Sequence, residues 1–156
     1  VTDFLRPEAY TERTRCRLTY ARDVVRVEYF PYRVRPVHRL QLVVRDDLDY
    51  RYKRADRRVL DEVFALRGQA DDVLIVRHGL LTDTSIANIA LWDGCEWHTP
   101  AHPLLEGTQR RHLLDTGQIK ETDIPAASLG SYRHIRLFNA LIPFGEVELP
   151  VSQVLY

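Results

Sequence analysis

The residue with the most distinctive chemistry in this chain is Lys53, in the stretch "YKRADRR". The chain holds 22 Lys and Arg, of which only Lys53 and Lys120 are lysines, and Lys53 lies among the arginines of residues 51–58. An arginine keeps its proton in proteins, whereas a lysine amine that loses its proton becomes a nucleophile able to form a Schiff base. Tyr50 and Tyr52 would supply the partly desolvated surroundings that favour the neutral amine. The alternative is a solvent-exposed lysine at the start of a helix.

A second polar group follows an apolar stretch, in "TDTSIAN" at residues 82–88. Asp83 ends the apolar stretch, and Ser85 and Asn88 follow it. One interpretation is an acid at the end of a strand, facing a cleft. The other is a polar turn between two hairpins, in which Asp83 caps the turn.

A third group, "LLEGTQRR" at residues 104–111, is typical of the start of a helix. Gly107 would let backbone N–H groups approach a ligand, and a helix N-terminus favours an anion such as phosphate. Arg110 and Arg111 add positive charge nearby. Compositions of this kind are common at helix starts, so the motif alone is a weak signal.

The histidines and cysteines do not indicate a metal site. The six histidines show no ligand spacing such as H-E-x-x-H. Cys16 and Cys95 stand alone, without a histidine partner or a disulfide framework, and this predicts a reduced, cytoplasmic protein.

Composition places the chain among soluble globular proteins. It has 156 residues, 45% of them hydrophobic and 28% charged, with a net charge of zero. A neutral chain has no basic field to attract nucleic acid or anionic lipid, and its apolar runs are too short to span a membrane. The sequence has no methionine, so we expect a further segment upstream of Val1.

Alternation and helical periodicity predict an α+β fold. Asp-Gly at 93–94 favours a two-residue turn. We expect strands at 16–21, 24–32 and 38–45, a helix at 54–67, a hairpin at 73–83 turning near His78-Gly79, a hairpin at 87–100 turning at Asp93-Gly94, a helix at 107–117, a strand at 119–124, and within 132–149 a strand, a loop at 139–143 and a final segment.

Taken in order, these motifs resemble those of the class IV aminotransferases, the pyridoxal-phosphate (PLP) enzymes of fold-type IV. Members of that family carry a Schiff-base lysine, then T-E-G-x-x-x-N, then T-P, then L-P-G-I-T-R. The counterparts here are "YKRADR", "TDTSIAN", "HTP" and "LLEGTQR", and with "IRLFNALIPF" they look most like the short 4-amino-4-deoxychorismate lyase-like branch. The resemblance covers residues 45–145.

The resemblance implies a small N-terminal α/β part and a larger, barrel-like C-terminal part. Residues 1–47 would be what this chain holds of the small part, which looks incomplete, and residues 48–156 would form the cofactor-binding domain. Family members usually build their site near a dimer interface, so a homodimer is also implied.

The resemblance further implies roles around the PLP ring for residues of the first two motifs. Lys53 would hold the cofactor as a Schiff base and, once freed, act as the acid and base that moves the substrate's α-proton. Asp83 would take the place of the family's glutamate, which pairs with the pyridine nitrogen and keeps it protonated. Ser85 and Asn88 would support the face of the ring.

Two further segments correspond to the family's phosphate-binding turns. Thr108 and Gln109 fall where the family offers backbone N–H groups to the 5′-phosphate. Asn139 and Ala140 fall where a second phosphate-binding or substrate-side turn is expected.

The sequence also departs from the family pattern. Aspartate at position 83 is one methylene shorter than the family's glutamate, and Gln109 replaces a threonine. Arg57 and Arg58 lie where the family has a tyrosine. No L-x-E-T strand or H-x-x-R segment precedes residue 16.

The implied activity is that of a 4-amino-4-deoxychorismate lyase, which removes the substrate's α-proton and eliminates pyruvate to give 4-aminobenzoate for folate synthesis. An aminotransferase of the branched-chain or D-amino-acid type is the alternative enzyme, because both reactions begin with loss of the α-proton. A different class is a non-catalytic relative that keeps the fold as a binding or dimer-forming module.

Overall fold

The computed structural model describes residues 6–20, 24–48, 50 and 57–156. The chain divides into two compact units, Val1–Arg35 and Pro36–Tyr156. This division lies upstream of the predicted domain boundary between residues 47 and 48, because a strand before that boundary joins a sheet of the second unit. The boundary at 47/48 itself stays a prediction.

The first unit is built on one antiparallel hairpin. Its strands are β1 (Thr14–Tyr20) and β2 (Val24–Pro31), preceded by the short 3-10 helix η2 (Pro7–Ala9). Two arginine guanidiniums of β1 lie over the ring of Phe30, at 5.0 and 5.1 Å from its centroid. Residues 21–23, at the junction of the first two predicted strands, lie outside the described residues.

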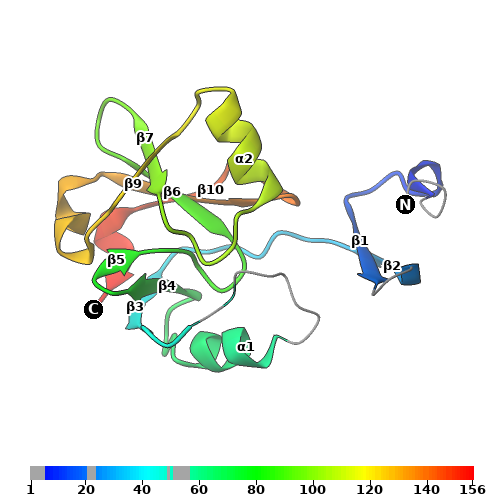
Figure 1. Ribbon diagram of the computed structural model, residues 1–156, viewed down its shortest axis with the longest axis horizontal. Helices are drawn as coiled ribbons and strands as arrows, with labels where there is room; N and C mark the ends of the chain where they lie inside the picture. The colour runs from blue at the N-terminus through cyan, green and yellow to red at the C-terminus, as the bar shows by residue number, and fades with distance from the viewer. Residues whose placement is uncertain (1–5, 21–23, 49, 51–56) are drawn as a thin grey trace. The chain divides into compact units, whose positions relative to one another are not determined.

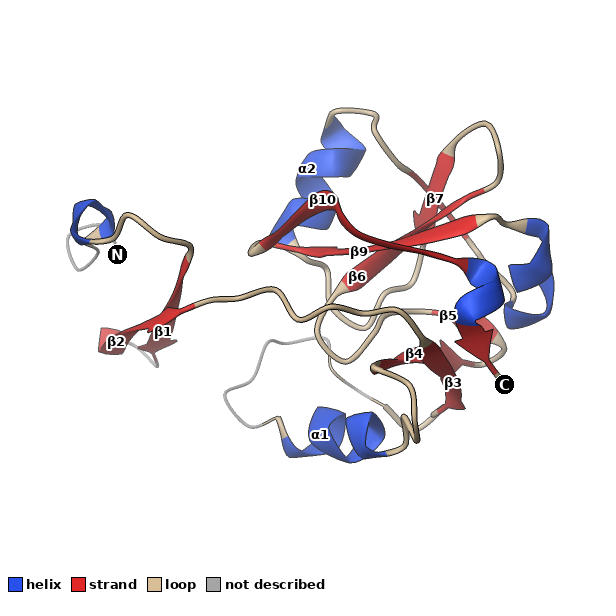
Figure 2. Ribbon diagram, turned by 180° about the vertical axis from the view of Figure 1, so that it is seen from behind, coloured by secondary structure: helices blue, strands red, loops and turns tan. Residues whose placement is uncertain are grey.

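The second unit contains two sheets, seen from opposite sides in Figures 1 and 2. The four-stranded sheet has the order β11-β3-β4-β5, with β3 (Leu40–Val44), β4 (Asp72–Arg77), β5 (Leu80–Leu81) and β11 (Val154–Leu155). The five-stranded sheet has the order β10-β9-β6-β7-β8, with β6 (Asn88–Trp92), β7 (Trp97–Pro100), β8 (Lys120–Thr122), β9 (His134–Asn139) and β10 (Ile142–Pro150). The 3-10 helices η3 (Ala126–Ser131) and η4 (Val151–Gln153) flank β9 and β10.

Each α-helix of the second unit connects two parallel strands. The helix α1 (Arg58–Ala65) lies between the parallel pair β3 and β4, and α2 (Thr108–Asp115) lies between the parallel pair β7 and β8. Parallel neighbours need a crossover connection, and a helix is the usual one. This mixture of helices and two sheets confirms the predicted α+β class.

The amphipathic face of α1 packs on the four-stranded sheet. Leu60 and Val63 of α1 are buried against Val43, Val73 and Ile75. The exposed face of α1 carries charged residues together with Val59. The helix ends earlier than the predicted 54–67, and residues 54–56 lie outside the described part of the chain. Within that part, none of the helices has the length and apolar content to cross a membrane.

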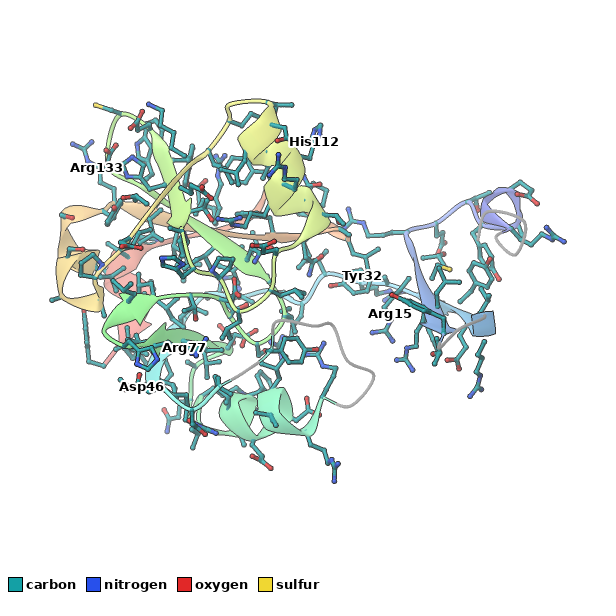
Figure 3. All side chains as sticks on the ribbon, viewed as in Figure 1. Arg15, Tyr32, Asp46, Arg77, His112 and Arg133 are labelled. Carbon is teal, nitrogen blue, oxygen red and sulfur yellow. The ribbon has the colours of Figure 1, made fainter. Side chains whose placement is uncertain are left out.

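The hairpin turn predicted near residues 78–79 is confirmed. His78 has φ 49° and Gly79 has φ 78°, the positive values that a two-residue turn of type I′ requires. The His78 N–H donates to Oδ1 of Asp46 at 2.6 Å, and Figure 3 shows Asp46 beside Arg77, the last residue of β4.

The two-residue turn predicted at Asp93-Gly94 is wrong. Trp92 pairs with Trp97, so the connection is a four-residue loop from Asp93 to Glu96. The carboxylate of Asp93 accepts the backbone N–H groups of Cys95 and Glu96, at 2.7 and 2.9 Å, and this side-chain capping stabilises the longer loop.

A second hydrophobic cluster lies between α2 and the five-stranded sheet. Phe138 of β9 is fully buried there, with Leu113 of α2 and Ile119, and its ring meets that of Phe144 edge to face at 5.3 Å. Truncating a buried phenylalanine removes apolar area and leaves a cavity. This cluster therefore anchors α2 to the sheet.

We expect Phe138→Ala to lower the free energy of unfolding by about 3–5 kcal/mol, the usual cost of a buried Phe-to-Ala change. Urea unfolding followed by circular dichroism would measure this. Val59→Ala on α1 is the control, because Val59 is 46% exposed and should change stability by less than about 0.5 kcal/mol. Equal effects of the two changes would contradict the assignment of this core.

Candidate functional site

The candidate site is built around the turn at residues 83–88, where the chain passes from the four-stranded to the five-stranded sheet. The Thr84 N–H donates to the Ala87 carbonyl at 2.9 Å, and Asp83 and Asn88 face each other across the turn as an antiparallel bridge. All but one of the turn's residues are buried. The polar turn, one of the two interpretations of the sequence, is thus present, with Asp83 two residues beyond the end of β5. The cleft of the other interpretation stays a prediction.

Asp83 is a buried carboxylate held by three hydrogen bonds. Its Oδ1 accepts from Nδ2 of Asn88 at 2.8 Å. Its Oδ2 accepts from the backbone N–H groups of Leu104 and Leu105, the second at 3.1 Å. Burial raises the pKa of the Asp83 carboxyl to about 6, while these hydrogen bonds and the charge of Arg110 act in the opposite direction.

The start of α2 lies next to this turn. Gly107 is the N-cap residue, with φ −70° and ψ 147°, and no side chain among the described residues caps the helix by a hydrogen bond. The residues Thr108 and Gln109 form the first turn, with Thr108 exposed and Gln109 half-buried. A Cβ on Gly107 would lie only 2.2 Å from Oδ1 of Asn88, so the helix start and the turn are in close contact.

Arg110, expected to add positive charge near the start of α2, is held by other groups inside the protein. Its side chain is buried, and one terminal nitrogen donates to the Pro100 carbonyl at 2.9 Å and to Glu121 at 3.0 Å. Its Nε has no hydrogen-bond partner among the described residues. Arg110 therefore joins α2 to the end of β7 and to the middle residue of β8.

Ser85 is buried and connects the turn to two other elements through its backbone. Its N–H donates to Oδ1 of Asp72 at 3.3 Å, and its carbonyl accepts from a terminal nitrogen of Arg57 at 2.9 Å. Asp72 begins β4, and Arg57 is the N-cap residue of α1. The turn is thereby linked to the start of α1.

Asn139 brings a third segment to the turn. Its Nδ2 donates to the Ile86 carbonyl at 3.0 Å, while its Oδ1 accepts from the N–H groups of Leu141 and Ile142 at 2.8 and 3.0 Å. Ala140 is exposed in this tight connection between β9 and β10, which is shorter than the predicted loop at 139–143. The Asn139 side chain thus closes its own turn and contacts the turn at 83–88.

Lys53 lies outside the described residues. The described residues nearest to it on either side are both attached to the region of the site. Tyr50 packs against the hydrophobic cluster that includes Leu104, and Arg57 donates to Ser85.

No three His, Cys, Asp or Glu side chains within the described ranges are grouped to hold a metal ion. His98 contacts Glu96 at 3.0 Å, and His102 contacts Asp123 at 3.5 Å, so the two histidines that are four residues apart have separate partners. His112 is exposed on α2 (Figure 3).

Three contacts of this site were not predicted from the sequence: those of the Leu104 and Leu105 N–H groups, of Arg57 and of Asp72. Nothing marked the Leu104 and Leu105 N–H groups as partners of Asp83, or Arg57 as a partner of Ser85. Asp72 carried a weak signal, because an acid directly before the apolar run "VLIV" is a common way to hold backbone N–H groups at a strand start.

The sequence profile of the family described as amino-transferase class IV matches residues 13–149. The chain belongs to this family. The predicted family and the fold-type IV architecture are therefore confirmed.

Several relatives resemble this class IV chain over between 46% and 83% of its length. An uncharacterized protein of Haemophilus influenzae is 37% identical over 81% of this chain and 68% of its own. The crystal structure of a provisionally named 4-amino-4-deoxychorismate lyase from Haemophilus somnus is 37% identical, with a TM-score of 0.79, over 83% of this chain and 66% of its own. A provisionally named aminodeoxychorismate lyase of Schizosaccharomyces pombe is 37% identical over 46% of this chain and 34% of its own.

Other class IV structures share the fold at lower identity. A provisionally named amino-acid aminotransferase from Mesorhizobium loti is 27% identical, with a TM-score of 0.71, over 87% of this chain and 70% of its own. The PLP-bound form of a hypothetical aminotransferase from Mycobacterium tuberculosis is 17% identical, with a TM-score of 0.66, over 82% of this chain and 53% of its own. The class IV chain thus spans between about a third and 70% of the lengths of these relatives.

Proposed function

We propose that this chain is the cofactor-binding part of a PLP-dependent lyase that acts on 4-amino-4-deoxychorismate. The reaction removes the substrate's α-proton and eliminates pyruvate, leaving 4-aminobenzoate, a precursor in folate synthesis. The observation that carries the proposal is the meeting of three motif segments, 83–88, 104–109 and 139–142, at one turn. The lyase assignment is supported by the 37% identity to the Haemophilus somnus protein.

The start of α2 fits the phosphate group of PLP. Within the described part of the chain no side chain caps the first-turn N–H groups of Thr108 and Gln109, and the turn "TQRR" carries no acidic residue. Free N–H groups at a helix N-terminus attract phosphate. Asn139 and Ala140 form the neighbouring turn, from which a second contact to the phosphate is proposed.

The Asp83 carboxylate fits the opposite end of the cofactor, the pyridine nitrogen. Its Oδ2 accepts two hydrogen bonds and its Oδ1 only one, so Oδ1 keeps a free acceptor position. With a pKa of about 6 the carboxyl is mostly ionised at neutral pH and would hold a protonated ring nitrogen. When bound, PLP supplies an electron sink for the charge left by loss of the α-proton.

Lys53 is the proposed base. Its Nζ would take the proton from the substrate's Cα and later return it, which requires an amine that can lose its own proton. Support comes from the order of the motifs, and from the attachment of Tyr50 and Arg57 on either side to the region of the site. Ser85 and Asn88, which lie in the same turn as Asp83, are proposed to support the face of the PLP ring.

An aminotransferase is the second candidate, and the Mesorhizobium loti structure favours it. Both reactions use the same proton transfer, so the residues described above serve either one. A homodimer in the cytoplasm, with no nucleic-acid or membrane partner, remains part of the proposal.

The decisive experiment adds PLP to the purified chain and follows absorbance in the violet, where lysine-bound PLP absorbs. The loaded chain is then given 4-amino-4-deoxychorismate, and in parallel amino acids with α-keto acid acceptors. We expect the absorbance band and the release of 4-aminobenzoate with pyruvate. Amino transfer without 4-aminobenzoate would establish the second candidate, and a folded chain without the band would contradict both and favour a non-catalytic binding module.

A further inference from the structure

Asn88 occupies the centre of the candidate site. It is the first residue of β6 and is 6% exposed. Its Nδ2 donates to Oδ1 of Asp83 and to the Leu105 carbonyl, both at 2.8 Å. One amide nitrogen therefore uses both of its hydrogens to join the acid to the segment that precedes α2.

The other atom of the Asn88 amide faces Gly107. The space between them is so small that a Cβ at position 107 would lie 2.2 Å from Oδ1 and 3.4 Å from Cγ of Asn88. The Asn88 side chain cannot turn aside without breaking the two hydrogen bonds of its Nδ2. A glycine at position 107 is thus required by the contact with Asn88, since its φ of −70° needs no glycine.

Asp83 also binds the backbone of the segment that precedes α2, through its other carboxylate oxygen. Its Oδ2 accepts the N–H groups of Leu104 and Leu105, while Asn88 donates to the carbonyl of Leu105. The backbone of residues 104–107 is therefore fixed by two side chains that are also hydrogen-bonded to each other. Asp83, Asn88 and Leu104 are buried, and the two hydrogen bonds to Leu105 are partly buried. Hydrogen bonds to a charged group are strong in such surroundings.

We infer that Asn88 is a positioning residue that fixes the start of α2 relative to the Asp83 carboxylate. This rests on the proposed function, in which α2 binds the cofactor's phosphate and Asp83 its ring nitrogen. The two ends of a rigid cofactor can be bound together only if their binding groups are held at one separation. Asn88 sets that separation through Leu105 and Gly107.

The chemistry of asparagine suits this role in a way that similar residues do not. Aspartate at position 88 would place a second negative charge against Asp83 and would lose both donors. Alanine would leave the Leu105 carbonyl and one position of the Asp83 carboxylate without a partner. Only a side chain with two donors on one atom can join these two acceptors.

The test compares Asn88→Ala with Thr99→Val. Thr99 is also fully buried, and its Oγ1 donates to the Ile89 carbonyl at 2.7 Å in the same sheet, outside this network. The affinity of each chain is measured for PLP and for pyridoxal, which lacks the phosphate. Amide hydrogen exchange at Leu105 and Thr108 is measured in the cofactor-free chains.

We expect Asn88→Ala to lower the preference for PLP over pyridoxal by about tenfold, the effect of one hydrogen bond to a charged group. Exchange at Leu105 and Thr108 should become faster. Thr99→Val should lower stability without changing either readout. Gly107→Ala, which displaces Asn88 from the other side, should reproduce the effect of Asn88→Ala.

The inference is overturned if wild type binds PLP and Asn88→Ala keeps both the preference and the exchange rates. A wild-type chain that binds no PLP contradicts the proposed function instead. In that case unchanged exchange at Thr108 in Asn88→Ala would overturn the inference as well, and faster exchange would support the positioning of α2 by Asn88.

Discussion

The Lys53→Arg variant is expected to form no violet absorbance band with PLP and to lose at least about a thousandfold in turnover, the scale of a lost general base. A guanidinium keeps its positive charge but does not give up its proton in proteins, so it can neither condense with the cofactor's aldehyde nor take a proton from the substrate. Spectrophotometric titration with PLP measures the first effect, and release of 4-aminobenzoate measures the second.

The chain offers a matched control in its other lysine. Lys120 is exposed at the start of β8 and forms an ion pair with Glu96, a contact that arginine can also make. We expect Lys120→Arg to keep both the band and the turnover. A band that survives Lys53→Arg and disappears in Lys120→Arg would assign the reactive amine to Lys120 and contradict the family alignment.

Replacing Asp83 by asparagine is expected to weaken PLP binding by about 10- to 100-fold at neutral pH. This is the loss of affinity expected when one hydrogen bond to a charged group is removed. The variant loses the negative charge proposed to face the ring nitrogen. Its amide also brings a donor into a place where three donors, from Asn88, Leu104 and Leu105, already converge. At least one of these contacts must therefore break, and equilibrium titration at pH 7 would show the loss.

The same substitution should change how stability depends on pH. The Asp83 carboxyl has its ordinary pKa of 3.8 in the unfolded chain and a pKa of about 6 when buried. Between these values the folded state binds more protons than the unfolded state, so the free energy of unfolding falls as pH rises from 4 to 6. The fall attributable to Asp83 is about 3 kcal/mol in total, and it is complete above the folded pKa.

Urea unfolding at several pH values would isolate this effect as the difference between wild type and Asp83→Asn. Asp93→Asn is the control, because loop N–H groups lower the pKa of Asp93 and its contribution is lost only at more acid pH. If the free energy of unfolding falls with pH equally in wild type and in Asp83→Asn, the Asp83 carboxyl ionises at its ordinary pKa.

Local sequence patterns predicted those elements whose geometry is decided by neighbouring residues. His78-Gly79 gave the correct turn because glycine accepts a positive φ and the apolar strands around it fix the register. The Asp93-Gly94 turn was wrong because the Asp93 carboxylate captures two N–H groups and so stabilises a longer loop. Val154–Leu155 was not predicted as a strand, since two residues show no periodicity and only the edge of β3 orders them.

The burial of Arg110 is a feature of the site that local sequence patterns did not predict. Its place in "GTQRR" marked it only as a source of positive charge at the start of a helix. Its actual partners, the Pro100 carbonyl and Glu121, are 10 and 11 residues away in the chain. Their approach depends on the parallel pairing of β7 with β8, which no short motif encodes.

The sequence by itself determined the family, because the order and spacing of "YKRADR", "TDTSIAN", "HTP" and "LLEGTQR" are a joint pattern that survives the loss of any one piece. It also marked Asp83 and Asn88 as the polar residues of one turn. Only the tertiary structure decided what they bind. The Leu104 N–H donates to Asp83, Asn88 donates to the Leu105 carbonyl, and Asn88 contacts Gly107. These contacts join segments 17 to 21 residues apart, and they form only when two sheets and a helix pack together.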